Sequence, residues 1–134
     1  MAIQNILIVD DSPTERFYLT DILARAGYAV STAVNGEEAI DKIRAERPQL
    51  ILMDVVMPGA NGFQVTRSIA RDPELAAIPV IICSSKNQET DRIWGMRQGA
   101  KDYLVKPVDP ALLLAAIAAL DARPAPAMAA AAAA

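Results

Sequence analysis

Short apolar runs alternate along the chain with longer segments whose apolar residues recur at helical spacing. Runs at 6–9, 50–53, 80–83 and 103–105 are nearly all apolar, as in strands covered on both faces, and a mixed run at 29–33 predicts a further strand. A helical pattern follows each run, at about 13–26, 36–46, 63–71, 89–98 and 110–120.

Start and stop residues support these helices. Ser12 is placed to cap the first one, Pro13 fits its first helical position, and Glu15 would complete a capping box. Gly27 supplies a stop for this helix, and Asn35 can cap the next.

Five strand-then-helix units in a row predict an α/β fold: a doubly wound, five-stranded parallel sheet with helices on both faces. Sheets of this kind bind ligands beyond the carboxyl ends of their strands, where the strand order reverses. The residues that follow each strand are therefore the first place to look for chemistry.

The chain has 134 residues, of which 53% are hydrophobic and 22% charged, which suits one domain with a substantial core. We expect this domain to span 1–122. The Pro/Ala-rich segment 123–134 is of low complexity, and a linker, a helical extension or a cloning remnant would each explain it. The net charge of −3 and the lack of a basic cluster argue against nucleic acid as a partner.

The chain has no histidine, which excludes Ser-His-Asp catalysis and His-ligated zinc. Its single cysteine, Cys83, lies in an apolar run and is expected to be a core residue. The N-terminus does not resemble a signal peptide, and no apolar run approaches the roughly 20 residues that span a bilayer. We therefore expect a soluble, cytoplasmic protein without membrane insertion.

Polar residues gather where the predicted strands end. Asp10 and Asp11 follow the first strand, Asp54 the third, Ser84 the fourth and Lys106 the fifth. Two carboxylates about 5 Å apart repel each other by ~3 kcal/mol at an effective dielectric of ~20. A group of three carboxylates therefore needs a positive charge that compensates for this repulsion. A hard cation with oxygen ligands provides one, and few carboxylates plus waters suit Mg²⁺ better than Ca²⁺.

Each of these residues alone has an ordinary explanation. The aspartates could be solvated loop residues or a polar strand end, Ser84 could begin a turn, and Lys106 could be a surface lysine before a proline. Their joint position at one edge of the sheet favours a site.

In combination these residues resemble the receiver domain of two-component response regulators, the CheY-like fold. The resemblance covers residues 6 to about 120 and implies the strand order 2-1-3-4-5. The matching motifs are Val9-Asp10-Asp11-Ser12, Met53-Asp54-Val55-Val56-Met57-Pro58-Gly59 with Asn61-Gly62, Ser84-Ser85 and Lys106-Pro107.

A finer resemblance is to the PilH-type single-domain regulators of type IV pilus twitching motility. The segments that carry it are Asp11-Ser12-Pro13-Thr14-Glu15, Gly62-Phe63-Gln64, Gln88-Glu89-Thr90-Asp91, Trp94-Gly95, Arg97-Gln98-Gly99-Ala100 and Asp102-Tyr103-Leu104.

The resemblance implies that Asp54 is the phosphoacceptor, with a phosphohistidine on a histidine kinase or phosphotransfer protein as donor. Asp10, Asp11 and Asp54 would hold Mg²⁺ together with the backbone carbonyl of Val56. Lys106 would neutralise oxygens of the transferred group.

The same resemblance implies a switch in which Ser84 donates to the phosphoryl group and Tyr103 turns inward from an exposed position. The changed surface would comprise the helix at 89–98, the strand at 103–105 and the last helix, and would bind a downstream protein. Trp94 in this region could equally be a packing residue or an anchor for a partner.

Two positions depart from the family pattern and put the lifetime of the phosphorylated state in doubt. Val56 lies two residues after the acceptor and Lys86 two residues after Ser84. An apolar Val56 cannot orient water by hydrogen bonding, and Lys86 is placed to contact phosphate.

Three functions compete. The leading one is a signalling switch without enzymatic turnover, and a second is a phosphate sink that drains a shared kinase. The third is an aspartate-nucleophile phosphohydrolase. That chemistry usually needs an acid two residues beyond a nucleophile on the first strand and a cap domain, whereas here Asp10 and Asp11 are adjacent.

Overall fold

A computed structural model describes residues 2–59 and 61–121. Five parallel strands form one sheet in the order β2-β1-β3-β4-β5, so the predicted fold and strand order are confirmed. The strands are β1 (Asn5–Val9), β2 (Ala29–Ala33), β3 (Leu50–Met53), β4 (Val80–Ser84) and β5 (Asp102–Val105). The helices of the described part are α1 (Pro13–Arg25), α2 (Gly36–Glu46), α3 (Gly62–Arg71), α4 (Glu89–Arg97) and α5 (Pro110–Asp121).

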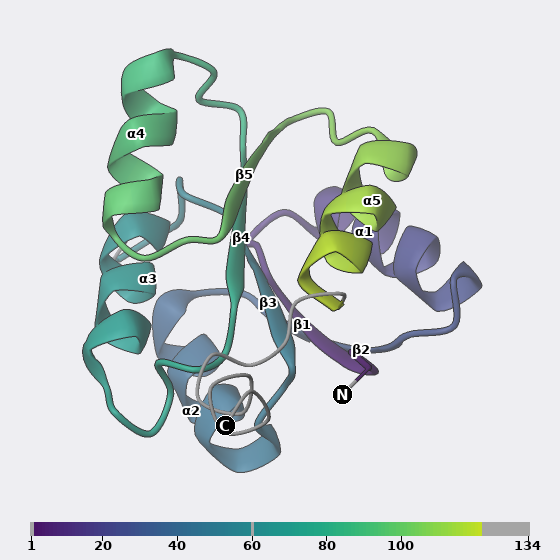
Figure 1. Cartoon of the computed structure of the whole chain (residues 1–134), viewed down its shortest axis with the longest axis horizontal. Helices are drawn as coiled ribbons and strands as arrows, with labels where there is room; N and C mark the ends of the chain where they lie inside the picture. Colours follow the sequence, from purple (N-terminus) through teal and green to yellow (C-terminus); the bar gives the residue numbers. More distant parts are fainter. Residues whose placement is uncertain (1, 60, 122–134) are drawn as a thin grey trace, which may run out of the picture.

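The helices cover the two faces of the sheet unequally (Figure 1). On one face, Leu19 and Leu23 of α1 and Leu113 and Ile117 of α5 pack on buried side chains of the central strands such as Ile8. The other face is covered by α2, α3 and α4. The sheet is therefore buried between two layers of helices.

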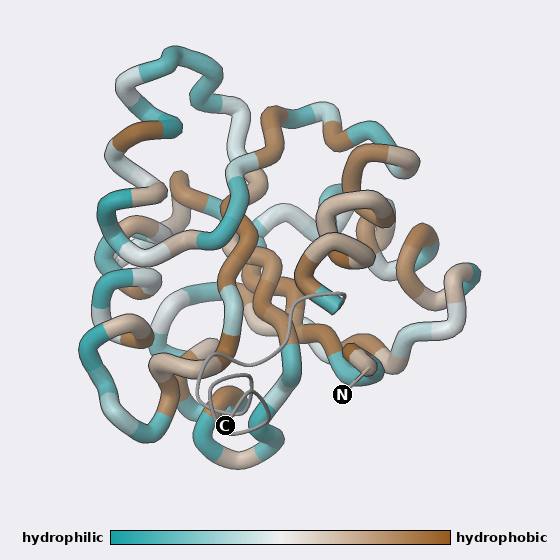
Figure 2. The backbone as a smooth tube through the Cα atoms, viewed as in Figure 1, coloured by the Kyte–Doolittle hydropathy of each residue, from teal (hydrophilic) through white to brown (hydrophobic). Residues whose placement is uncertain are grey.

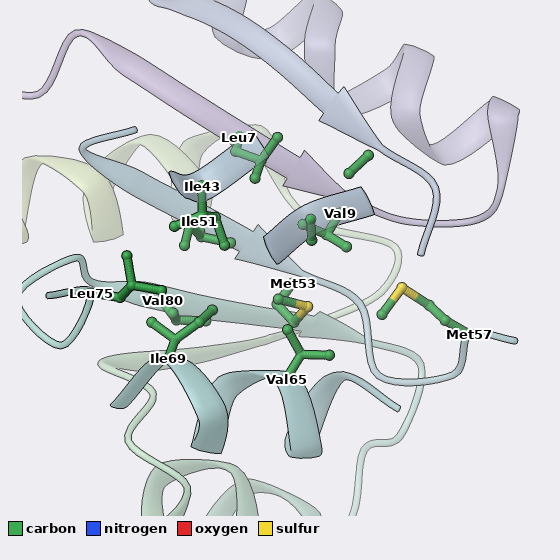
Figure 3. Packing of buried hydrophobic residues seen from close by; sticks show 12 residues of the cluster. Leu7, Val9, Ile43, Ile51, Met53, Met57, Val65, Ile69, Leu75 and Val80 are labelled. Carbon is green, nitrogen blue, oxygen red and sulfur yellow. The ribbon is translucent and has the colours of Figure 1, made fainter. Parts of the chain in front are cut away.

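The core on the second face explains why the central strands β1, β3 and β4 are mostly apolar. Ile43 of α2 and Val65 and Ile69 of α3 pack against Ile51 and the neighbouring strand residues (Figure 3). Figure 2 shows the same distribution along the backbone, with the apolar segments concentrated in the centre of the molecule. Each fully buried Leu or Ile side chain stabilises the fold by about 1.5–3 kcal/mol relative to exposure.

Strand β4 is one residue longer than the apolar run predicts. The amide of Lys106 donates to the carbonyl of Ser84 at 2.9 Å, and Ser84 pairs with Val105 in the register of β4 and β5. The hydrogen-bond ladder between β4 and β5 therefore holds Ser84 at the carboxyl end of β4, where it is completely buried.

The helix caps agree with the sequence except at one point. The Ser12 hydroxyl accepts from the amide of Glu15 at 3.2 Å, and Asn35 accepts from the amide of Glu38 at 2.8 Å. The predicted capping box of α1 is wrong in its second half, because the Ser12 amide donates to Asp10 Oδ1 at 2.9 Å instead of to Glu15. The start of α1 is thus tied to an acidic residue of the strand end.

Cys83 is a core residue of β4, as expected, and is only 2% exposed. Burial raises the pKa of its thiol to about 12. The tail at 123–134 and the last residue of the predicted domain, 122, lie outside the described residues.

Candidate functional site

Backbone hydrogen bonds bring two acidic residues to adjacent strand ends. Val9 of β1 pairs with Met53 of β3, and the amide of Asp54 continues this ladder by donating to the carbonyl of Val9 at 2.9 Å. On the other side of β1, the amide of Asp10 donates to the carbonyl of Ala33 at 3.0 Å. Asp10 and Asp54 are therefore fixed side by side by the sheet itself.

Their side chains meet the ammonium group of Lys106, which follows β5 and is distant from both in sequence. The Nζ of Lys106 lies 2.8 Å from Asp10 Oδ2 and 3.1 Å from Asp54 Oδ1. Both carboxylates are nearly buried, with Asp10 1% and Asp54 7% exposed. One cation thus bridges two buried anions at the carboxyl edge of the sheet.

Asp11 completes the acidic cluster. One carboxylate oxygen each from Asp10, Asp11 and Asp54 lies within 4.8 Å of the others. Asp10 and Asp54 are buried, whereas Asp11 is exposed to solvent. All three donors are hard oxygen atoms, and Asp11 remains open to water, which is the ligand chemistry that Mg²⁺ favours. The residues present therefore fit a divalent cation of this type.

Two hydrogen bonds that the sequence pattern does not predict hold the loop after β1. The Ser12 amide donates to Asp10 Oδ1, and Arg16 Nη1 donates to the backbone carbonyl of Asp10 at 2.8 Å. Arg16 sits six residues from Asp10, in the first turns of α1, so nothing in the local pattern distinguishes it from a solvated helix residue.

The loop after β3 depends on Gly62. A Cβ atom at this position would lie 1.9 Å from the carbonyl oxygen of Asp54 and 2.9 Å from Cα of Val55. The amide of Gly62 also donates to the carbonyl of Val55 at 2.9 Å. The first turn of α3 is thus packed directly on the backbone of Asp54, an approach that only glycine permits.

Electrostatics raise the pKa of Asp54 above its ordinary value. Burial is the main cause, and the charge of Asp10 adds to it, while Lys106 and the amide of Val55 act in the opposite direction. For Lys106, burial alone would lower the pKa, but the hydrogen bonds and charges of Asp10 and Asp54 outweigh it and raise the pKa. Without a metal ion, the charge of Lys106 therefore does not fully compensate for the burial of Asp54 and its repulsion by Asp10.

In metal-free buffer, Asp54→Asn should raise the free energy of unfolding by on the order of 1 kcal/mol. The amide keeps an oxygen for Lys106 but removes the charge that burial and Asp10 disfavour. Because the folded-state pKa of Asp54 is raised, its ionisation opposes folding. The extra free energy of unfolding of the Asp54→Asn variant is therefore absent below the pKa of an unfolded aspartate. It reaches its full value above the folded-state pKa of Asp54.

Urea unfolding followed by circular dichroism at acid and neutral pH measures this difference. Asp41→Asn, which removes an exposed carboxylate of α2, is the control. Equal stability of the Asp54 variant and the wild type at neutral pH would contradict the prediction.

Ser84 and Tyr103 are linked through one loop segment. The Ser84 hydroxyl accepts from the amide of Lys86 at 3.1 Å, and the Tyr103 hydroxyl donates to the carbonyl of the same residue at 2.8 Å. Tyr103 is only 2% exposed, so it already lies inward here, whereas the resemblance implied a side chain that starts from an exposed position. Burial raises the pKa of its hydroxyl. The loop after β4 is thus fastened to both side chains that the sequence analysis assigned to the switch.

Val56 and Lys86 border the site from the outside. Val56 is 60% exposed, and the two residues line one hollow of about 380 Å³ beside the acidic cluster. The structure therefore brings together Asp10, Asp11, Asp54 and Lys106 and places Val56 and Lys86 at the rim.

Residues 6–118 match the family of response regulator receiver domains. This chain belongs to that family. It is 56% identical to Protein PilH of Pseudomonas aeruginosa over 115 residues, which cover 86% of this chain and 95% of PilH. It is 37% identical to the chemotaxis protein CheY of Thermotoga maritima over 116 residues, covering 85% of this chain and 94% of CheY.

Solved receiver structures have the same fold. A putative response regulator from Chloroflexus aurantiacus superposes with a TM-score of 0.86 at 32% identity, covering 90% of this chain and 99% of the other. The chemotaxis protein CheY4 of Vibrio cholerae gives 0.81 at 31% identity, covering 88% and 98%.

A receiver domain implies interaction with a kinase or phosphotransfer partner. Within the described ranges of this receiver, none of the helices combines the length and apolar character that a bilayer span requires.

Proposed function

We propose that the protein is a stand-alone two-component response regulator that carries a phosphoryl group on Asp54. The observation that carries this proposal is the Lys106 ammonium group lying between the buried carboxylates of Asp10 and Asp54. The receiver domain spans 1–122, the protein acts in the cytoplasm, and it switches by binding rather than by enzymatic turnover.

Asp54 acts as the nucleophile. A carboxylate oxygen attacks the phosphorus of a phosphohistidine on a histidine kinase or phosphotransfer protein. The phosphorus–nitrogen bond breaks, its electron pair stays on the imidazole, and the imidazole then takes up a proton. The exposed rim at Val56 leaves a path for the donor, and Lys106 is within reach of the oxygens that gain charge.

Magnesium is the proposed cofactor. Asp10, Asp11 and Asp54 would hold it, with the backbone carbonyl of Val56 as the fourth protein ligand. Bound there, Mg²⁺ supplies neutralisation of the negative charge on the transferring phosphoryl group. The protein's own part is to hold the carboxylates in place through the sheet, the Ser12 amide and Arg16.

Phosphorylation is read out through Ser84 and Tyr103. A phosphoryl group at Asp54 adds roughly two negative charges and strong acceptor oxygens, to which the Ser84 hydroxyl donates. Because the Ser84 hydroxyl accepts from the Lys86 amide, its own proton stays available for phosphate, and a shift of Ser84 toward the phosphoryl group moves the segment to which Tyr103 is also bonded. The face formed by α4, β5 and α5 changes in consequence and binds the downstream protein.

We place the protein in pilus motility. The similarity to PilH extends over 95% of that relative, which is therefore little larger than a receiver domain itself. Twitching motility driven by type IV pili is the process that we infer for this chain.

Incubation with acetyl phosphate and Mg²⁺, followed by intact-mass measurement, tests the function. We expect up to one phosphoryl group per chain and none when EDTA replaces Mg²⁺. A chain that hydrolyses p-nitrophenyl phosphate over many turnovers would be a phosphohydrolase and would overturn the proposal. A chain that takes up no phosphoryl group under these conditions would overturn it as well.

Val56→Asn should shorten the lifetime of the phosphorylated protein several-fold. The valine side chain is exposed at the rim of the site and cannot orient water, whereas an amide can donate to and accept from it. The decay of the phosphorylated mass after removal of acetyl phosphate gives the rate, and Val34→Asn, at an exposed position after β2, is the control. An unchanged rate would remove any role of Val56 in the lifetime.

A further inference from the structure

A groove runs between α3 and α4, on the face of the sheet opposite α1 and α5 (Figure 1). Arg67 and Arg71 from α3 and Trp94 and Arg97 from α4 line a hollow of about 360 Å³ in it. We call this surface, with the adjoining hollow at Val56 and Lys86, the α3–α4 groove. Its second hollow borders the acidic cluster, and the groove shares only α4 with the α4-β5-α5 face.

Two glycines set how closely the helices approach. A Cβ at Gly99 would lie 2.7 Å from Cβ of Ala70 in α3, and a Cβ at Gly95 would lie 3.2 Å from Cε1 of Phe63. The glycine backbones therefore lie directly against Ala70 and the Phe63 ring of α3. The long side chains of the arginines and Trp94 stand beside these contact points and form the walls.

The three arginines of the groove have no anionic partner within the described residues. Arg67, Arg71 and Arg97 make neither an ion pair nor a side-chain hydrogen bond there, and even Asp72, next to Arg71, pairs with Arg44 at 2.8 Å. Every other arginine of the described part has a partner: Arg16 the Asp10 carbonyl, Arg25 Asp21, Arg44 Asp72, Arg47 Glu74 and Arg92 Asp102. The groove therefore carries three guanidinium charges without an internal counter-charge, on a chain whose net charge is −3.

Trp94 adds an apolar component to the same groove. Its side chain lines the arginine hollow and also the hollow of about 380 Å³ that includes Val56 and Phe63. The residue is 49% exposed although it is a large aromatic residue on a helix, and Ile93 beside it is 45% exposed. Tryptophan and arginine are the residue types that most often dominate protein interfaces energetically.

We infer that the α3–α4 groove docks an acidic segment of a partner protein that also carries an apolar side chain. Carboxylates of the segment pair with Arg67, Arg71 and Arg97, for which a guanidinium offers bidentate geometry. The apolar side chain lies against Trp94 and enters the hollow next to Val56. This docking does not depend on phosphorylation of Asp54, so it can hold or fail independently of the proposed function.

Trp94 is the only tryptophan of the chain, so its fluorescence reports binding directly. The probe is a short synthetic peptide of glutamates interrupted by leucines, and the controls are peptides with glutamine or lysine in place of glutamate. We expect saturable binding of the glutamate peptide alone, weakening as salt is raised. Arg67→Glu, Arg71→Glu and Arg97→Glu should each weaken it at least about tenfold, whereas Arg25→Glu on α1 should leave it unchanged.

Circular dichroism and phosphoryl uptake from acetyl phosphate verify that the arginine variants remain folded and active. No fluorescence response to the glutamate peptide, or equal binding by the wild type and all three variants, would overturn the inference. An equal response to inorganic phosphate or a nucleoside triphosphate would also overturn it, because the groove would then be a small-anion site. Sedimentation velocity that shows a dimer lost in Arg97→Glu would overturn it in favour of a second copy of the chain.

Discussion

Replacing Asp54 by alanine should abolish phosphoryl uptake from acetyl phosphate, from about one group per chain to none. The site has one carboxylate that is buried, held next to Lys106 and still adjacent to the exposed rim at Val56. Asp10 is held by the Ser12 amide and by Lys106 at 2.8 Å, which leaves its oxygens less free to attack phosphorus. We therefore expect no second acceptor in the cluster.

Intact mass after incubation with acetyl phosphate and Mg²⁺ measures this loss. Asp41→Ala is the matched control, because it removes an exposed carboxylate outside the cluster and should leave uptake unchanged. Asp54→Asn provides a second variant with a nearly identical side-chain shape. Persistent labelling of both Asp54 variants would show that another residue is the acceptor.

The second large effect is expected at Gly62, where alanine should destabilise the domain by about 3 kcal/mol or more. The new methyl group would overlap the Asp54 carbonyl oxygen, which lies 1.9 Å from the Cβ position. Relief requires α3 or the strand end to move, and either movement costs packing against β3. Because Asp54 itself is displaced, the rate of phosphoryl uptake should fall along with stability.

Gly27→Ala separates this overlap from the usual cost of replacing a glycine. Gly27 has a φ of 98°, with nothing within 4 Å of a Cβ, so alanine there meets only backbone strain of about 1 kcal/mol. Urea unfolding of both variants followed by circular dichroism compares the two. A Gly62 variant no less stable than the Gly27 variant would show that the loop after β3 can relax.

The sequence predicted most of the fold because its information is local. Buried strands such as 50–53 are uniformly apolar, and Asn35 and Gly27 mark helix ends with residues suited to caps and positive φ. The strand order is not local information, and it came from the resemblance to receiver domains. The capping box at Glu15 failed because the Ser12 amide donates to the carboxylate of Asp10, a contact that the helix pattern alone does not reveal.

The site could be predicted in part because the carboxyl ends of parallel strands all lie on the same side of a sheet. Asp10, Asp54 and Lys106 meet there as expected. Two other features depend on how the helices pack against the strand ends, which residue spacing in the sequence does not predict. These are the close approach of Gly62 to Asp54 and the hydrogen bond from Arg16 to the Asp10 carbonyl. The arginine groove is a similar case, because its walls come from two helices whose mutual distance is set by packing.

The burial of the only cysteine has a practical consequence for spectroscopy. A thiol with a pKa of about 12 that is shielded inside β4 does not form a thiolate accessible to maleimide reagents at neutral pH. A cysteine introduced at an exposed position of α4 or α5 can therefore be spin-labelled or coupled to a dye in the otherwise natural background. Distances between such labels, with and without phosphorylation, would test whether the face proposed to bind the downstream protein moves.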